Sequence, residues 1–169
     1  MDSMDMILTR RSIRKYTDQN ISNDILFELI NTAFSAPTAG NQQPWHFIII
    51  DDKKILKKVT EFHPNSKMLL DAQKAILVCG DLDLEKFKGY WMLDCSAATE
   101  NILLAARCKG IGSCWLGIYP REDRILHLRS LLNMPENIIP FSLISLGYPA
   151  EEFCKVNRYN KLRVHYNKW

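Results

Sequence analysis

Four short runs of apolar residues determine which kinds of fold are open to this chain. They cover residues 45–50, 75–79, 113–118 and 139–146. Apolar runs of this length, rich in isoleucine, valine and aromatic residues, are typical of strands in a buried sheet. The segments between them differ in length and in apolar period, so they do not make a regular alternation of strand and helix. We therefore expect one central sheet with helices around it.

Segments with helical spacing of apolar residues lie between these runs. In the clearest of them, Ser22 suits the N-cap position and Pro37 ends the helix. The spacing predicts helices over residues 2–9, 22–36, 51–60, 89–109 and 120–132. No strong period remains after residue 149, and we expect the last ~20 residues to form an arm that packs on another surface.

The predicted helix over residues 89–109 is apolar almost all round. Glu100 is the only charged residue between Cys95 and Ala106. A helix of this composition belongs in the interior of a structure. Gly110 follows it as a natural C′ residue. We expect Asp94, on the same helix, to be a buried carboxylate whose hydrogen bonds are satisfied.

Size and charge narrow the class of protein. A chain of 169 residues has the length of one domain, so we expect a single domain over residues 1–169. The 22 basic residues stand against 19 acidic ones, and this small excess does not indicate a nucleic-acid-binding protein. No apolar run approaches the ~18 residues of a membrane span, and the N-terminus lacks the apolar core of a secretory signal.

Cysteine usage points to a reducing compartment. The chain has five cysteines and no CxxC pair. Cys79 and Cys114 fall in strand-like runs and Cys95 and Cys108 in the long helix, as buried reduced cysteines do. We therefore predict a cytoplasmic protein. The four histidines have no metal-ligand spacing with the cysteines, so we expect no metal site.

The first candidate site is a cluster of three arginines, Arg10, Arg11 and Arg14, with Ser12 among them. A guanidinium binds phosphate through a planar fork of donors, and a serine hydroxyl adds one more. In an extended backbone Arg10, Ser12 and Arg14 would share a face. Residue type alone leaves two readings open, a phosphate site and a solvated basic surface.

Two further segments carry candidate ligand contacts. Residues 36–45 are rich in small and amide side chains, and Asn41 offers both a donor and an acceptor. Residues 110–117 contain three glycines that let backbone amides approach a ligand. Taken alone, the two segments also fit an ordinary connection and a buried strand. The chain has no GxGxxG after a strand, no P-loop motif and no GxSxG, which argues against those nucleotide sites and a serine hydrolase.

Together these segments resemble the nitroreductase family of FMN-dependent oxidoreductases. The similarity covers nearly the whole chain. It rests on Arg-Arg-Ser-Ile-Arg-Lys-Tyr at 10–16, Pro-Thr-Ala-Gly-Asn-Gln-Gln-Pro-Trp at 37–45, residues 94–104, residues 112–117, and Arg158 with the ending at 164–169.

The resemblance implies an α+β fold of nitroreductase type, with a central mixed but mostly antiparallel sheet flanked by helices. It also implies an intertwined homodimer with extended termini and an FMN site at each subunit interface. A homodimer and a small-molecule electron acceptor are therefore the expected partners, with no nucleic acid and no membrane.

The same resemblance implies roles for the basic residues. Arg10, Ser12 and Arg158 would hold the FMN phosphate, with Arg11 beside it. Arg14 would reach the ribityl chain or the pyrimidine edge of the flavin.

It implies further roles around the ring. Asn65 would lie near the polar edge, and the backbone N–H of Leu116 would point at flavin N5. One face of the ring would be lined by Cys114, Trp115, Leu116 and Gly117. The second subunit would contribute Pro37, Thr38, Ala39 and Asn41. No protein side chain is expected to act as a catalytic acid or base.

By this resemblance the activity is hydride transfer from NAD(P)H through flavin N5 to nitroaromatic, quinone or similar acceptors, in a ping-pong order. Two alternatives stay open: a specialised oxidation or dehalogenation on the same fold and cofactor, and a flavin-binding module without turnover. Residues 80–90 leave little room for the pocket-covering helices of larger relatives. The acceptor and the preference between NADH and NADPH are therefore not indicated.

Overall fold

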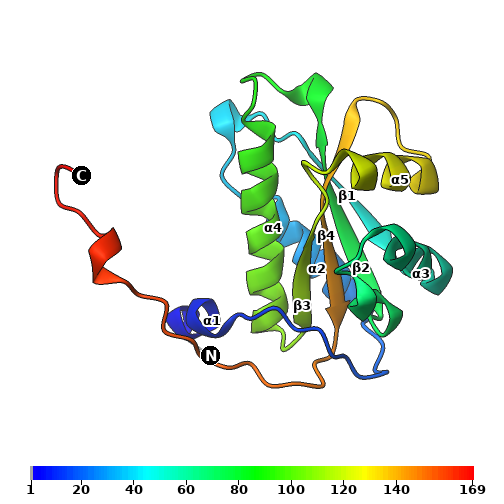
Figure 1. The fold of residues 1–169 in the computed structure, drawn as a ribbon, viewed down its shortest axis with the longest axis horizontal. Coiled ribbons are helices and arrows are strands. Elements are labelled where there is room, and N and C mark those ends of the chain that lie inside the picture. The colour runs from blue at the N-terminus through cyan, green and yellow to red at the C-terminus, as the bar shows by residue number, and fades with distance from the viewer. Residues whose placement is uncertain (1) are drawn as a thin grey trace.

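A four-stranded sheet forms the centre of the molecule (Figure 1). The computed structural model describes residues 2–169. The strand order is β1-β2-β4-β3, so β1 and β3 are the edges. All four predicted strands are confirmed, as β1 (Trp45–Ile50), β2 (Lys74–Asp81), β3 (Gly112–Gly117) and β4 (Ile138–Gly147).

The three pairings between these strands are all antiparallel. The expectation of a mixed sheet is therefore wrong for the strands within residues 2–169. The parallel contact is an isolated bridge between Ser12 and Ser113. The N-terminal segment meets β3 there without forming a ladder, and Tyr16 then makes an antiparallel bridge to Pro149.

Helices cover both faces of the sheet (Figure 1). Ile76 and Val78 of β2 pack into the core beneath α2 (Asn23–Ala33) and α4 (Trp91–Cys108). Leu77 and Cys79 pack into the core beneath α3 (Lys53–Phe62) and α5 (Glu122–Leu132). This alternation is the two-residue period of a strand, and covering both faces explains why β2 is apolar throughout.

The helix ends follow from local backbone hydrogen bonds. Ser22 is the predicted N-cap, with its Oγ accepting from Ile25 N at 3.4 Å. α2 ends at Ala33 rather than at residue 36, because the N–H groups of the next residues bond three residues back and tighten the chain before Pro37. Gly110 has a φ of +72°, the left-handed conformation that favours glycine at C′. α1 (Ser3–Thr9) also forms, and α3 and α5 each begin two residues later than predicted.

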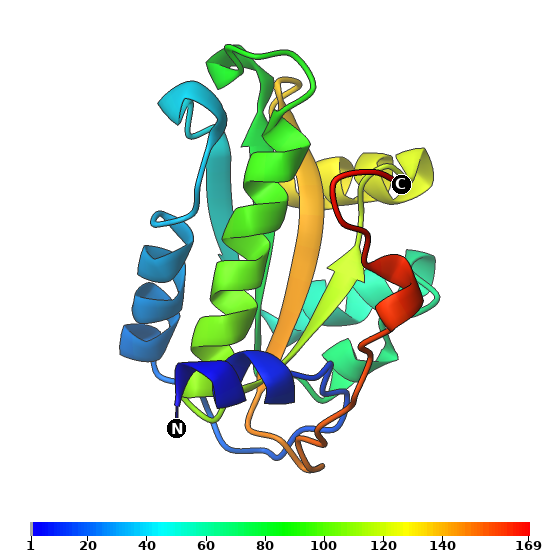
Figure 2. The same ribbon diagram turned by 90° about the vertical axis from the view of Figure 1, so that its left-hand side faces the viewer.

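The long helix α4 is buried on one side. Ile102 is fully buried, whereas Leu93 is 61% exposed and Cys108 is also exposed. Within one chain the prediction of an interior helix therefore holds for one side only, and the prediction of a buried Cys108 is wrong there. The sheet and α2 cover one face, and α1 crosses one end of the other (Figure 2). The remaining buried cysteines are confirmed as Cys79, Cys95 and Cys114.

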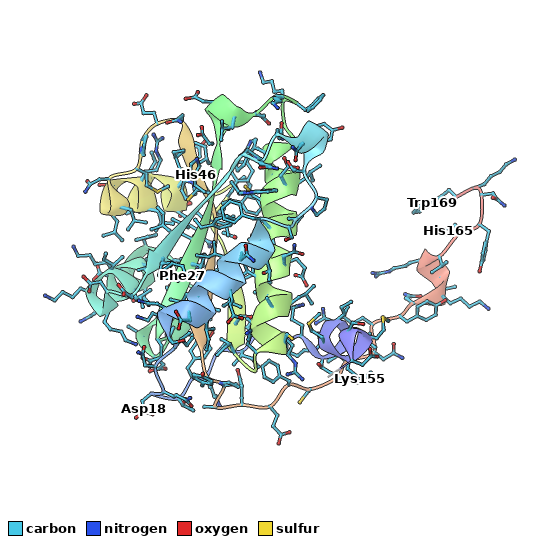
Figure 3. All side chains as sticks on the ribbon, turned by 180° about the vertical axis from the view of Figure 1, so that it is seen from behind. Asp18, Phe27, His46, Lys155, His165 and Trp169 are labelled. Carbon is cyan, nitrogen blue, oxygen red and sulfur yellow. The ribbon has the colours of Figure 1, made fainter. Side chains whose placement is uncertain are left out.

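The C-terminal arm, residues 155–169, leads away from the body of the molecule (Figure 1). Figure 3 shows Lys155 near α1 and Trp169 far from it. Tyr166 is 88% exposed and Trp169 is 102% exposed. The predicted arm is thus present, and within residues 2–169 its aromatic side chains do not enter a core.

Two glycines fix the N-terminal strap, residues 10–16, against the sheet. Gly112 and Gly147 are register partners in β3 and β4. A Cβ on Gly112 would lie 2.7 Å from Ile13 Cγ2, and one on Gly147 would lie 2.6 Å from Tyr16 Cγ. Ile13 and Tyr16 occupy this space and are buried. The bare backbone of the two glycines therefore determines where the strap lies.

Gly147→Ala is expected to destabilise the fold by about 1–3 kcal/mol, because the added methyl overlaps the Tyr16 ring in a packed core. The free energy of unfolding from urea titration measures this. Gly117→Ala in β3 is the matched control, since nothing lies within 4 Å of a Cβ there. An equal loss of stability in the two variants would contradict the packing argument.

Candidate functional site

A pocket of about 460 Å³ lies against the edge strand β3. Its volume falls in the range typical of small-molecule sites, about 300–1,000 Å³. Arg14 comes from the N-terminal strap and Arg124 from α5. Most of residues 63–68, after α3, and all of residues 114–117, in β3, complete the lining. Four separate segments of the sequence therefore line one pocket.

The pocket unites six of the residues expected at a ligand site. They are Arg14, Asn65, Cys114, Trp115, Leu116 and Gly117. The sequence reasoning missed His63, Lys67 and Arg124, which line the same pocket. Lys67 lies two residues after Asn65, so the segment that contained Asn65 was the available signal for it.

The charge of the lining is one-sided. Arg14, Lys67 and Arg124 are cations, and no carboxylate lines the pocket. None of these three takes part in an ion pair among the described residues. Unpaired guanidinium and ammonium groups around a cavity favour a ligand with anionic oxygens.

His63 and Arg124 converge on one backbone carbonyl, that of Gly117. Arg124 Nη1 donates to Gly117 O at 2.5 Å, and His63 Nε2 lies 3.1 Å from the same oxygen. His63 is 2% exposed. Burial, with the Arg124 charge beside it, lowers the pKa of His63 below its usual value, so the ring is neutral at pH 7.

The backbone of β3 alternates between β4 and the pocket side. The carbonyl of Ser113 accepts from Ile13 N and that of Gly117 from Arg124, so both point away from β4. In an edge strand alternate residues turn their N–H and C=O groups toward the neighbouring strand. The Leu116 N–H therefore faces β4. We take the Gly117 N–H, rather than that of Leu116, as the backbone donor on the pocket side.

Two other strap residues, Arg10 and Arg11, make contacts within the chain. Arg10 Nε lies 3.2 Å from Glu100 Oε1 on α4, and its side chain is 23% exposed. Arg11 donates to the carbonyls of Leu8 and Cys154 at 2.6 and 2.7 Å, which ties the strap to the C-terminal segment. Arg11 thus has a structural contact that its residue type did not indicate.

Strap residues also surround the thiol of Cys114. Burial raises the pKa of this thiol, and the nearby charge of Arg14 opposes that shift. Cys114 is therefore a neutral, buried side chain at the inner end of the pocket lining.

A second predicted segment, the polar loop at residues 37–43, is held by Asp94. The Asp94 carboxylate accepts from Thr38 Oγ1 at 2.9 Å, Ala39 N at 3.0 Å and Gln42 Nε2 at 2.6 Å. Asp94 is 4% exposed. The expectation of a buried carboxylate with satisfied hydrogen bonds is confirmed.

The polar loop has an unusual backbone. Gly40, Asn41 and Gln43 have φ values of +51°, +55° and +49°. Such conformations cost non-glycine residues about 1–3 kcal/mol and concentrate at functional sites. The loop does not line the β3 pocket of its own chain, and Figure 2 shows α4 between the loop and strand β3. Pro37, Thr38, Ala39 and Asn41 are therefore separate from the other predicted residues within one chain.

Arg158 is not brought to the pocket either. It lies in the C-terminal arm and is exposed. Among residues 2–169 no three His, Cys, Asp or Glu side chains gather as metal ligands. The helices of the same range include none with the length and apolarity to cross a membrane.

The sequence matches the family model described as Nitroreductase family over residues 7–78 and 63–148. It is also 52% identical, over 172 residues, to an Archaeoglobus fulgidus protein with the provisional name NADH dehydrogenase/NAD(P)H nitroreductase. That alignment covers 99% of this chain and 99% of the relative.

Two solved structures share the fold over nearly their full length. One, from Parabacteroides distasonis, has the same provisional name and a TM-score of 0.95 at 39% identity, covering 99% of this chain and 98% of the other. The second is an FMN-dependent nitroreductase from Clostridium difficile. Its TM-score is 0.91 at 28% identity, with coverage of 98% and 99%.

Proposed function

Because this chain belongs to the nitroreductase family, we propose that it is an FMN-dependent oxidoreductase. It takes reducing equivalents from NAD(P)H and passes them to nitroaromatic, quinone or similar small acceptors. The similarity to an FMN-dependent nitroreductase supports the cofactor. The name of the Archaeoglobus fulgidus relative includes NAD(P)H, which supports NADH or NADPH as the electron donor.

The proposal rests on one observation: the pocket combines unpaired positive charges with an accessible backbone at Gly117. The three unpaired cations that line the pocket suit a ligand with an electron-rich polar edge that becomes anionic on reduction. Apart from Gly117 and its two chain neighbours, no heavy atom of residues 2–169 lies within 4 Å of where a Cβ on Gly117 would be. A flat ring can approach the backbone of β3 there, which a side chain would prevent. The residues present therefore fit FMN.

The proposed contacts combine the pocket lining with residues that the family resemblance implies, since Arg10 and Ser12 are not among the residues that line the pocket. Arg10 and Ser12 hold the phosphate, Arg14 the ribityl chain or pyrimidine edge, and Asn65 with Lys67 the polar edge. Residues 114–117 line one face of the ring, with the Gly117 N–H as donor. When bound, FMN supplies the hydride chemistry, and the protein binds and orients it. One open pocket then serves donor and acceptor in turn, which is a ping-pong order.

A second copy of the chain completes the site in this proposal. In one chain the polar loop and strand β3 lie on opposite sides of α4 (Figure 2), and the loop does not line the β3 pocket. In this proposal the loop of a partner reaches that pocket instead. The outer side of α4 has an apolar hollow of about 370 Å³ lined by residues including Met6, Leu104 and Ala105. Exposed aromatic residues of the C-terminal arm supply a second apolar surface. Obligate homodimer interfaces have this apolar character. The partner brings Pro37, Thr38, Ala39 and Asn41, and the arms bring Arg158.

An absorbance spectrum tests the function directly. Purified protein is expected to carry an oxidised flavin band that NADH or NADPH bleaches and a nitroaromatic or a quinone restores. A protein that takes up no FMN would refute the cofactor. Retained FMN that neither nucleotide reduces would refute the NAD(P)H-dependent activity and favour another donor or a binding module.

Arg10→Ala is expected to weaken FMN binding by about 10- to 150-fold, because a hydrogen bond to a charged group contributes about 1.5–3 kcal/mol. The dissociation constant from flavin fluorescence measures the effect. Lys15→Ala removes an exposed charge from the same strap and is the control, with FMN affinity expected to stay near the parent value. Equal losses in the two variants would point to a general charge effect instead of a phosphate contact.

Deleting the C-terminal arm, residues 155–169, is expected to convert the dimer to monomer and to reduce FMN retention. The arm's apolar side chains have no core of their own to join. Sedimentation velocity reports the mass and absorbance reports the flavin. A deletion variant that remains a fully loaded dimer would show that the arm is dispensable for assembly.

A further inference from the structure

Arg124 and His63 hold a glycine whose backbone faces the pocket. Gly117 ends β3, and its N–H and C=O lie on the side away from β4. Glycine has more backbone freedom than any other residue, so a glycine donor needs restraint to keep one direction. Arg124 from α5 and His63 from the segment after α3 both reach the Gly117 carbonyl, at 2.5 and 3.1 Å. Arg124 therefore fixes the Gly117 peptide by donating to its carbonyl, and His63 packs beside both groups.

Of these two residues, only Arg124 carries a positive charge. Arg124 lines the pocket and joins no ion pair among residues 2–169, so no carboxylate neutralises its guanidinium. Its Nε is buried without a hydrogen-bond partner among the same residues. His63 contacts Arg124 Nη1 at 3.1 Å and adds no second positive charge, because its ring is neutral. One uncompensated positive charge thus stands beside the Gly117 peptide.

We infer that the uncompensated charge of Arg124, held beside the Gly117 peptide, raises the reduction potential of the bound FMN. The inference rests on the proposed function. Oxidised FMN takes up two electrons and one proton to give a reduced, anionic ring. An uncompensated positive charge in the pocket stabilises that anion more than the neutral oxidised ring. Arg124 therefore raises the potential without taking part in hydride transfer.

Arg124→Met tests the charge, because methionine keeps an apolar chain of similar length and removes the buried, unpartnered Nε. The reduced cofactor is expected to bind about tenfold more weakly, with less than about a threefold change for oxidised FMN. For a two-electron couple, the resulting difference of about three- to tenfold between the two redox states corresponds to a midpoint potential lower by about 15–30 mV. Spectroelectrochemical titration gives the potential, and flavin fluorescence gives the oxidised dissociation constant.

Two other variants complete the experiment. Arg124→Lys keeps the positive charge but lacks the planar guanidinium. Its FMN midpoint potential is expected to lie much closer to that of the parent than the potential of Arg124→Met does. Arg121→Gln removes a charge one residue before the start of α5. Arg121 pairs with Asp123 at 3.6 Å and lies outside the pocket lining. The FMN midpoint potential of the Arg121→Gln variant is therefore expected to match that of the parent. Should Arg124→Met fail to fold, Arg124→Gln is measured with the same expectations.

The outcomes separate the two proposals. A loaded Arg124→Met protein with the parent's potential overturns this inference and leaves the proposed function intact. Equal weakening of both FMN redox states also overturns it, because that result shows a role in pocket shape alone. A shift of equal size in Arg121→Gln overturns it as a general charge effect. A parent protein that binds no FMN overturns both proposals.

Discussion

The packing of Ile13 and Tyr16 over two glycines is the contact on which the rest of the site depends. Gly112 and Gly147 face each other across β3 and β4, and their missing side chains admit the N-terminal strap. With Ile13 turned into the core, its neighbour Arg14 faces the pocket. The packing of Ile13 and Tyr16 thus determines where the guanidinium of Arg14 meets β3.

The division of the site by α4 is the second constraint. One face of this helix packs on the sheet, and its Asp94 anchors the polar loop through three hydrogen bonds. The pocket is lined by β3, and this strand lies on the other side of α4 from the loop (Figure 2). A buried carboxylate therefore supports a loop that one chain cannot deliver to its own pocket. This separation makes assembly part of the proposed site.

The sequence allowed the strands, the helices and about half of the pocket to be predicted, because those depend on local period and residue type. His63 and Arg124 carried no such signal: they meet only because α3 and α5 pack on the same face of the sheet. The backbone direction at Leu116 depended on which edge of β3 pairs with β4. The exposure of Cys108 depended on how much of α4 the rest of the chain covers. Each of these is a property of tertiary packing.

The ion pair between Arg10 and Glu100 has a kinetic consequence. Three arginines within five residues repel one another, and two carboxylates relieve this: Glu100 meets Arg10, and Glu151 accepts from the backbone of Arg14. The strap is therefore ordered before any anion reaches it. In the proposed FMN site, a phosphate that reached Arg10 would exchange one carboxylate partner for another oxyanion and would not have to organise a loose segment. Capture of the cofactor would then be governed by diffusion and the local field, with no slow folding step before it.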